Sequence, residues 1–360
     1  MRGLLAYFLY GEADHYQLEL TYSLLSAREH LRASDSGIRF LMISDERNRR
    51  PDLPAEALVA SPEELRAWQL DGTYNHAAKH GALQAALRRY GVPTVLIDSD
   101  TMFRGHPEQL FQRIAPGRMI MHCDEGALAD LEAELPAYRQ LIAQTGGRVG
   151  GVPVSLATRM YNSGIIGLAP EDADLLDRSR ALMRAILAEV DVFTTEQLAL
   201  GMVANERMTL GTSEDVVTHY WGGPRAYYRY QIRRSLPGLA QGDRLTALPD
   251  RLQVLRDLPP TRRSVGLRAR LLRALRKGDG IYAHAWSCAE HARRAMPDVE
   301  LANVWAEMAL SVLRYGLRER PPQFARDFAA FAPDRLAGLG WMQPKLRSAW
   351  AAYWAAPSGA

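Results

Sequence analysis

Two aspartates stand one residue apart at the end of an apolar run. Residues 94–97 read TVLI, and Asp98, Ser99 and Asp100 follow directly. Two carboxylates at this spacing, just past a strand end, can face one hard divalent cation, and oxygen ligands suit Mg²⁺ or Mn²⁺. Such an ion neutralises a diphosphate, as an enzyme requires when its leaving group is a nucleoside diphosphate. We therefore interpret Asp98 and Asp100 as metal ligands.

Two histidines compete for the role of a further ligand from the later part of the chain. His219 is followed by YWGGPR, in which the glycines let the backbone approach a phosphate and Arg225 supplies bidentate hydrogen bonds. His284 also follows a short apolar run and precedes a tryptophan. The glycines and the arginine favour His219, although His284 stays open.

The first half of the chain supplies alternating elements that could position these groups. Apolar runs predict strands at 4–10, 38–43, 57–60, 94–97, 118–122 and 161–168. Helical spacing predicts helices at 16–31, 75–89, 128–143, 177–190 and 196–204. Ser61, Pro62 and Glu64 have the pattern of a capped helix start. This alternation is typical of an α/β fold with a mostly parallel central sheet flanked by helices, where ligands bind beyond the carboxyl ends of the strands.

The later part of the chain changes character. Beyond Pro259 it is rich in arginine and mainly helical in pattern. We expect a catalytic domain at 1–290 and a helical C-terminal extension packed on it at 291–360; the resemblance described next implies that the first of these binds a nucleotide sugar.

The order of the segments resembles GT-A glycosyltransferases, particularly glycosyltransferase family 8 and its bacterial relatives. The segments that carry the resemblance, within roughly residues 1–230, are VLIDSDT at 95–101, Lys79 ahead of it, YNSGI at 161–165, TEQ at 195–197 and HYWGGPR at 219–225. Arg225 stands where family 8 has lysine, and Ala226-Tyr227 replaces its Pro-Trp.

The resemblance implies a GT-A-type fold, a nucleoside-diphosphate sugar donor, a hydroxyl acceptor and a divalent metal. The donor-binding residues it implies are Tyr10, Asp45, Lys79, Asp98, Ser99, Asn162, Gly164, Trp221, Gly222 and Arg225. The metal ligands it implies are Asp98, Asp100 and His219.

Glu196 and Gln197 lie where a group near the anomeric carbon is expected, and Asp124 is a further candidate for acceptor binding or base work. An inverting enzyme would use Glu196 as a general base, and a retaining one would use this region to stabilise oxocarbenium-like charge. An acidic residue in the first turn also stabilises a helix by itself. The stereochemical outcome therefore stays open.

Composition narrows the class of protein. The chain has 360 residues, 47% of them hydrophobic and 24% charged, which fits a folded globular protein, and its net charge of +3 argues against a nucleic-acid binder. Cys123 and Cys288 fit no CxxC pattern, so a reducing cytoplasm is the simpler expectation. No apolar run approaches 18 residues, and the apolar N-terminal run breaks at Gly11, so we expect neither a membrane span nor a signal peptide.

A basic segment lies at 262–277, with seven basic residues and no acidic one. Leucines interleave at helical spacing, and such a helix can lie on an anionic membrane surface. This would suit an enzyme that acts at the inner face of the membrane on a lipid-linked or lipopolysaccharide-type acceptor. It can equally pack on the core with a solvated basic face. No aromatic residue interleaves, which argues against nucleic acid.

Three other functions share parts of this pattern. A phosphatase of the haloacid dehalogenase class needs threonine two positions past its second aspartate, and the chain has Met102 there. A sugar-nucleotide pyrophosphorylase needs a glycine-rich loop with arginine after its first strand, and the chain has GEAD at 11–14. A non-catalytic nucleotide-sugar-binding protein on the same scaffold remains open.

Overall fold

The computed structural model divides the chain into two compact units. It describes residues 3–11, 14–131, 134–236, 245, 249, 251–257, 259, 261–275, 280–295, 298–316 and 320–356. The first unit comprises Met1–His219 and Gly238–Leu252, and the second comprises Tyr220–Pro237 and Gln253–Ala360. The second unit therefore begins well before the domain limit that we expected near residue 290, which falls inside helix α10 (Gly280–Arg294).

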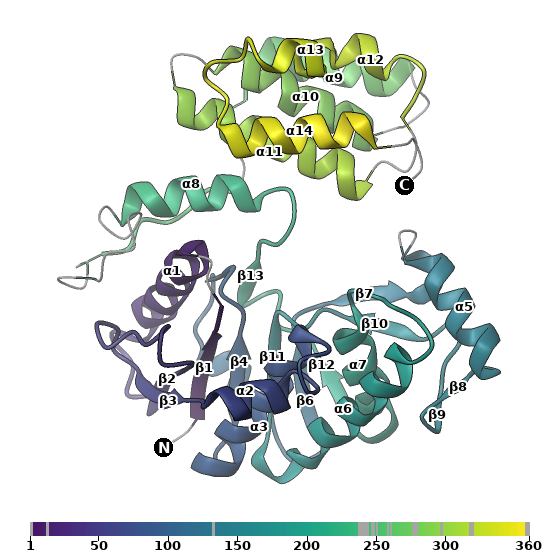
Figure 1. Cartoon of the computed structure of the whole chain (residues 1–360). Helices are drawn as coiled ribbons and strands as arrows, with labels where there is room; N and C mark the ends of the chain where they lie inside the picture. The colour runs from purple at the N-terminus through teal and green to yellow at the C-terminus, as the bar shows by residue number, and fades with distance from the viewer. Residues whose placement is uncertain are drawn as a thin grey trace. The chain divides into compact units, whose positions relative to one another are not determined.

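A seven-stranded sheet forms the centre of the first unit, with the strand order β12-β6-β11-β4-β1-β2-β3 (Figure 1). Its strands are β1 (Gly3–Leu9), β2 (Ile38–Ser44), β3 (Glu56–Val59), β4 (Thr94–Ile97), β6 (Arg118–Met121), β11 (Ile165–Leu168) and β12 (Thr209–Gly211). Neighbouring strands run parallel except at β11, which is antiparallel to both β4 and β6. The expected α/β fold with a mostly parallel central sheet is confirmed.

Helices cover both faces of this sheet. In the first unit they are α1 (Asp14–Leu31), α2 (Pro62–Trp68), α3 (Ala78–Tyr90), α4 (Glu108–Phe111), α5 (Leu135–Thr145), α6 (Asp174–Leu187) and α7 (Thr195–Arg207). The predicted capping box of α2 is present, because Ser61 Oγ accepts from the Glu64 N–H and the Glu64 carboxylate accepts from the Ser61 N–H. Helix α5 begins later than the apolar pattern indicated, with Pro136 in its first turn, where proline lacks only a hydrogen bond that the helix does not need.

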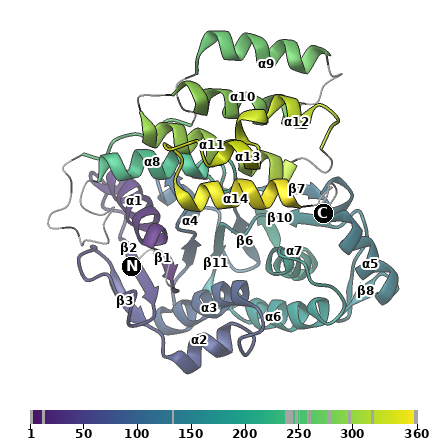
Figure 2. The same cartoon turned by 45° about the horizontal axis from the view of Figure 1, so that its top comes forward.

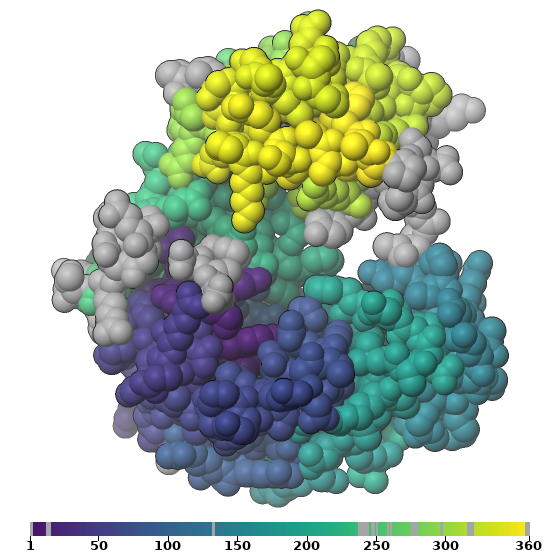
Figure 3. Space-filling model, in the orientation of Figure 1, coloured from purple at the N-terminus to yellow at the C-terminus, as the bar shows by residue number. Residues whose placement is uncertain are grey.

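Successive side chains of β1 point to opposite faces of the sheet, and the core therefore has two layers. Leu4 and Ala6 pack in the cluster that contains side chains of α2, α3, α6 and α7, whereas Leu5, Tyr7 and Leu9 pack in the cluster with α1 and α4. Helices α2, α3 and α6 lie side by side along one face of the unit, and their side chains form a continuous surface in the space-filling view (Figure 3). Helices thus cover both faces of the sheet.

The strand order reverses at β1, which lies between β2 and β4. In an open α/β sheet this reversal opens a crevice beyond the carboxyl ends of the two strands, and ligands bind there. Asp98 follows β4 directly at this position. The sequence therefore folds so that the Asp98–Asp100 segment lies where the topology provides a binding site.

Three small strand pairs complete the first unit. They are β5 (Thr101–Phe103) with β13 (Val217–His219), β7 (Asp124–Ala127) with β10 (Arg159–Tyr161), and β8 (Arg148–Val149) with β9 (Val152–Pro153). The run at 161–168 predicted one strand, but residues 162–164 form a break between β10 and β11. The backbone of Asn162 and Gly164 stays hydrogen-bonded across the break, while the side chains of Asn162 and Ser163 contact His219 and Glu196.

The described elements of the second unit are all helices (Figure 2). They are α8 (Arg225–Ser235), α9 (Arg263–Leu275), α10 (Gly280–Arg294), α11 (Val299–Gly316), α12 (Phe324–Asp327), the short 3₁₀ helix η5 (Ala329–Phe331), α13 (Pro333–Leu336) and α14 (Pro344–Ala355). Its core is aromatic, with Trp350 fully buried and stacked on Phe331 at 4.6 Å between ring centroids. No helix among the described residues combines the length and the apolar character needed to cross a membrane.

Candidate metal and nucleotide site

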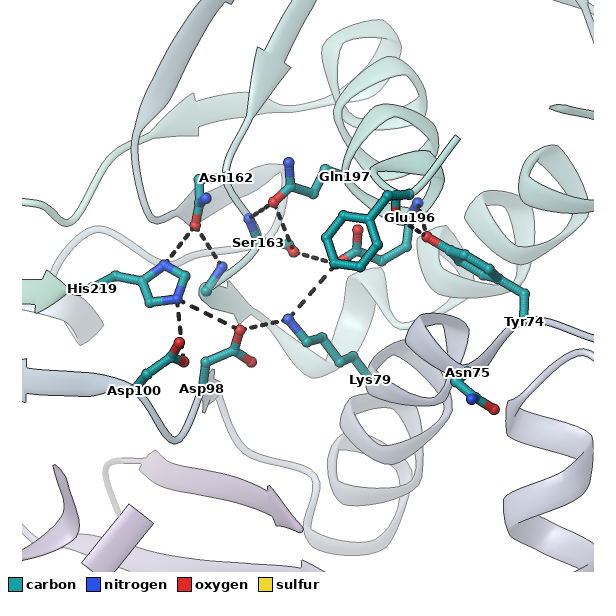
Figure 4. A network of polar contacts seen from close by, with 12 residues as sticks. Tyr74, Asn75, Lys79, Asp98, Asp100, Asn162, Ser163, Glu196, Gln197 and His219 are labelled. Carbon is teal, nitrogen blue, oxygen red and sulfur yellow. Dashed lines mark hydrogen bonds and ion pairs between the residues drawn. The ribbon is translucent and has the colours of Figure 1, made fainter. Parts of the chain in front are cut away.

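A short strand pair brings the late histidine to the two aspartates. Strand β13 pairs antiparallel with β5 so that His219 lies opposite Thr101, the residue after Asp100. His219 Nε2 is 3.3 Å from Asp100 Oδ1 and 4.0 Å from Asp98 Oδ2 (Figure 4). One ligand atom of each of the three residues lies within 4.8 Å of the other two. Of the two candidate histidines, His219 is the one that lies in this cluster. His284 lies on α10 in the second unit, where its Nε2 is 3.9 Å from Cys288 Sγ.

Asn162 determines which nitrogen of His219 carries the proton. The Asn162 Oδ1 atom accepts from the Gly164 N–H at 2.9 Å, while Asn162 Nδ2 donates to Glu125 Oε1 at 2.9 Å, so the amide has only one consistent orientation. His219 Nδ1 lies 2.9 Å from the same Oδ1. Because an amide oxygen only accepts, Nδ1 must donate, and in the neutral ring the lone pair is then on Nε2.

The donor set fits a divalent cation. The Nε2 lone pair points toward Asp98 and Asp100, and Asp100 is only 6% exposed. A neutral imidazole in this position repels the carboxylates unless a proton or a metal ion lies between them. Histidine metal ligands commonly donate their other N–H to an oxygen in this way, which fixes the ring. Asp98, Asp100 and His219 therefore form a cluster that could hold a divalent metal ion.

Gly164 makes room for the histidine ring. A Cβ atom at this position would lie 2.2 Å from His219 Nδ1. No side chain can occupy that space while the ring keeps its place. The glycine expected at a sugar site is thus required by the close approach of His219.

Lys79 on α3 supplies a cation beside the cluster. Its Nζ lies 2.6 Å from Asp98 Oδ2 and 3.7 Å from Glu196 Oε1. Burial favours the neutral amine, but the carboxylates of Asp98 and Glu196 outweigh it and raise the pKa of Lys79 above its ordinary value. The lysine is therefore charged at neutral pH and only 18% exposed.

A polar network joins the break before β11 to the start of α7. Ser163 Oγ donates to Glu196 Oε1, and the Ser163 N–H donates to Gln197 Oε1 at 3.3 Å. Gln197 Nε2 in turn donates to Glu125 Oε2 at 3.3 Å. Glu125 thereby links Asn162 to Gln197. Figure 4 shows the contacts of Ser163 with Glu196 and Gln197, by which the predicted donor and catalytic segments share one network.

Tyr74 attaches this network to an aromatic group that the sequence did not indicate. Its hydroxyl donates to the Phe193 carbonyl at 2.7 Å and accepts from the Glu196 N–H at 3.3 Å. The His76 ring meets Phe193 edge to face at 4.7 Å, and Phe193 is 73% exposed. Single aromatic residues in loops carry no pattern by which they could have been found.

The remaining predicted residues of the first unit are placed as follows. The Tyr10 hydroxyl donates to the Asn75 carbonyl, and burial is the main cause that raises the pKa of Tyr10 to about 12. Asp45 Oδ1 accepts from both the backbone and the side-chain nitrogen of Asn48, each at 2.8 Å. Asp124 pairs with Arg159, whose Nε lies 3.1 Å from its Oδ2, so its neighbour Glu125 is the carboxylate in the network. Ser99 is half-buried between the two aspartates.

Three predicted donor-binding residues belong to the second unit. Trp221 is 56% exposed, Gly222 has a φ of +79°, and Arg225 is the first residue of α8. The structure thus assigns them to the segment that follows His219, outside the first unit.

His122 is a neighbour of the cluster that the sequence did not indicate. Its ring is perpendicular to that of His219 at 5.3 Å between centroids. Burial, and secondly the proximity of His219, lower the pKa of His122 to about 4. A neutral His122 ring therefore lies against the His219 ring at physiological pH.

No family model matches the chain, and no curated protein matches it. Among solved structures, mouse xyloside xylosyltransferase 1 in its apo form is similar, with a TM-score of 0.41 and 14% identity, over 59% of this chain and 85% of that one. An active-site mutant of LgtC is similar with a TM-score of 0.40 and 13% identity, over 69% of this chain and 98% of that one.

Proposed function

We propose that this chain is a metal-dependent glycosyltransferase of GT-A type that moves a sugar from a nucleoside-diphosphate sugar to a hydroxyl group of a glycan or lipid-linked acceptor. One observation carries the proposal. Asp98, Asp100 and His219 converge at the carboxyl end of β4, where the strand order reverses, with the Lys79 cation alongside. A nucleoside diphosphate needs this combination of a cation site and a charged donor.

The three cluster residues and two neighbours, Lys79 and Asn162, have separate roles in the proposed reaction. Asp98, Asp100 and His219 would hold Mn²⁺ or Mg²⁺, and the ion supplies charge that neutralises the diphosphate leaving group. Lys79 adds a second positive charge next to Asp98. Asn162 holds the His219 ring so that Nε2 faces the ion site.

Glu196 and Gln197 are proposed to lie at the reacting sugar. Glu196 Oε1 accepts a hydrogen bond from Ser163 Oγ and lies 3.7 Å from Lys79 Nζ, next to the proposed diphosphate site. A carboxylate at this position can stabilise oxocarbenium-like charge or accept the proton of an acceptor hydroxyl. The anomeric configuration of the product, measured by proton NMR, separates the two roles.

The test is a panel of nucleoside-diphosphate sugars incubated with the full chain, with Mn²⁺ and with EDTA. We expect Mn²⁺-dependent release of the nucleoside diphosphate from one donor, and loss of that release in Asp100→Ala. Asp334→Ala, which removes an exposed carboxylate of the second unit, is the matched control and should behave as wild type.

Thermal unfolding with Mn²⁺ and each nucleoside diphosphate extends the test, because a ligand that binds the native state raises the apparent stability. A shift without turnover of any donor and acceptor pair would favour a non-catalytic nucleotide-sugar-binding protein. If no nucleoside diphosphate raises the melting temperature and no donor is turned over, the glycosyltransferase proposal is refuted.

A further inference from the structure

Helix α9 has one buried side and one apolar exposed side. It packs on α10, and Figure 2 shows it at the margin of the helical unit. Val265 is fully buried and Leu272 packs against the core of this unit, whereas Leu267 and Leu271 are 70% and 60% exposed. Two large exposed leucines one turn apart on one helix call for an explanation, because isolated exposed leucines are common but adjoining ones mark contact sites.

Helical geometry places these leucines opposite the buried side. At about 100° per residue, Leu267 and Leu271 lie about 200° and 240° from Val265 around the axis, and Arg263 and Arg270 lie about 160° and 140° from it. All four side chains belong to exposed residues. We call Arg263, Leu267, Arg270 and Leu271 the α9 outer face.

The charge of α9 is unbalanced. Arg263, Arg268, Arg270 and Arg273 are exposed, and none of them has a carboxylate partner among the residues that the structure describes. The helix has no acidic residue. Arg276 and Lys277, which end the predicted basic segment 262–277, lie outside the described residues. The described part alone presents four cations around two leucines.

We propose that the α9 outer face docks on an anionic lipid surface, with Leu267 and Leu271 entering the interface and the arginines contacting lipid phosphates. The leucines can bury apolar surface at the headgroup boundary, and the arginines beside them are attracted to the anionic lipid phosphates. A second copy of the helix would bring like charges together, and nucleic acid would give the leucines no apolar contact. At 1.5 Å per residue, α9 is about 20 Å long, too short to cross a bilayer core and suited to lying on it.

The experiment measures co-sedimentation of the full chain with vesicles of phosphatidylcholine alone and with vesicles that also contain phosphatidylglycerol. We expect binding only to the anionic vesicles, weakened by salt. The double variant Leu267→Gln with Leu271→Gln should lower the affinity roughly tenfold. Val254→Gln, at an apolar position of the same unit that is 76% exposed, is the matched control and should bind as wild type.

A second pair of variants separates the site from the overall charge. Arg263→Gln with Arg270→Gln should lower the affinity by roughly tenfold. Arg326→Gln with Arg335→Gln removes the same charge from two exposed arginines elsewhere in the unit and should leave binding unchanged. Circular dichroism checks that each variant is folded.

Several results would overturn the proposal. These are the absence of binding to anionic vesicles, equal losses from both arginine pairs, or unchanged binding of the leucine pair. If duplex DNA fully displaces the protein from anionic vesicles and the double leucine variant binds them as wild type does, the result would point to nucleic acid instead. Vesicle binding is measured without any sugar donor, so its failure leaves the proposed transferase activity to its own test.

Discussion

His219 Nδ1 donates a hydrogen bond to Asn162 Oδ1 across 2.9 Å, and the amide that receives it is itself fixed at both ends. The Asp98–Asp100–His219 cluster is therefore supported by a neighbouring residue that offers it no ligand atom. Asn162 positions the ring, whereas Asp98, Asp100 and His219 provide the ligand atoms.

Asn162→Ala should weaken Mn²⁺ binding about 10- to 100-fold, because the partners that orient metal-ligating histidines commonly contribute that much. Isothermal titration with Mn²⁺ measures the change. Asn303→Ala removes a buried amide from the second unit and controls for a general loss of stability. Unaltered Mn²⁺ affinity in Asn162→Ala would show that the hydrogen bond to His219 is dispensable.

Gly164→Ala should also impair metal binding, because the added methyl group would meet His219 Nδ1 at 2.2 Å and displace the ring. Gly201→Ala is the matched control, since its Cβ would lie 3.4 Å from the Tyr161 ring, within reach of a small adjustment. The Mn²⁺-dependent rise in melting temperature should be lost in the first variant and kept in the second. The opposite pattern would contradict the packing argument.

Lys79→Met should have opposite effects on the binding of Mn²⁺ and of a nucleoside diphosphate. Removing a cation 2.6 Å from Asp98 leaves that carboxylate more attractive to Mn²⁺, while a nucleoside diphosphate loses a positively charged contact. We expect equal or tighter Mn²⁺ binding and about tenfold weaker binding of the nucleoside diphosphate. Lys345→Met, at an exposed position of α14, is the control. Parallel losses of both ligands would mean that Lys79 only supports the fold.

His80 should make the protein sensitive to acid. It is fully buried, and neither ring nitrogen has a hydrogen-bond partner within the described ranges. Burial, and then the charges of Lys79 and Arg180, lower the pKa of His80 to about 3. As pH falls below about 6.5 the unfolded state binds a proton that the folded state refuses, so the free energy of unfolding declines until about pH 3.

His80→Leu removes this difference in proton binding. Between pH 7 and pH 5 the free energy of unfolding should decline by about 2 kcal/mol less in the variant than in wild type. Urea unfolding at both pH values, followed by circular dichroism, measures it. The exposed residue His30 provides the control His30→Leu. An identical pH dependence of His80→Leu and wild type would place the acid sensitivity elsewhere.

The longer elements of the first unit were predictable, because β1, β2 and β4 are apolar runs and α3 has helical spacing. Strands β5, β12 and β13 have three residues each, too few for a periodic pattern, and they form only because a partner from elsewhere in the chain lies alongside. The division into units was equally hidden. The chain leaves the first unit after His219 and contributes to it again at 238–252, and no composition change marks that return.

The site was predictable to the extent that it is local. Asp98 and Asp100 follow from one tripeptide at one strand end, but choosing between His219 and His284 required the pairing of β13 with β5. The direction of the hydrogen bond at Asn162 depends on Glu125 and Gly164, which the spacing of residues does not reveal.

The pairing of β13 with β5 has a mechanical consequence. His219 ends β13 and is also the residue after which the backbone passes into the second unit. A pull on the chain beyond this point reaches His219 before it reaches any other residue of the site. A divalent cation bound by His219 and the two aspartates would therefore resist the mechanical separation of the three-residue strand β13 from β5.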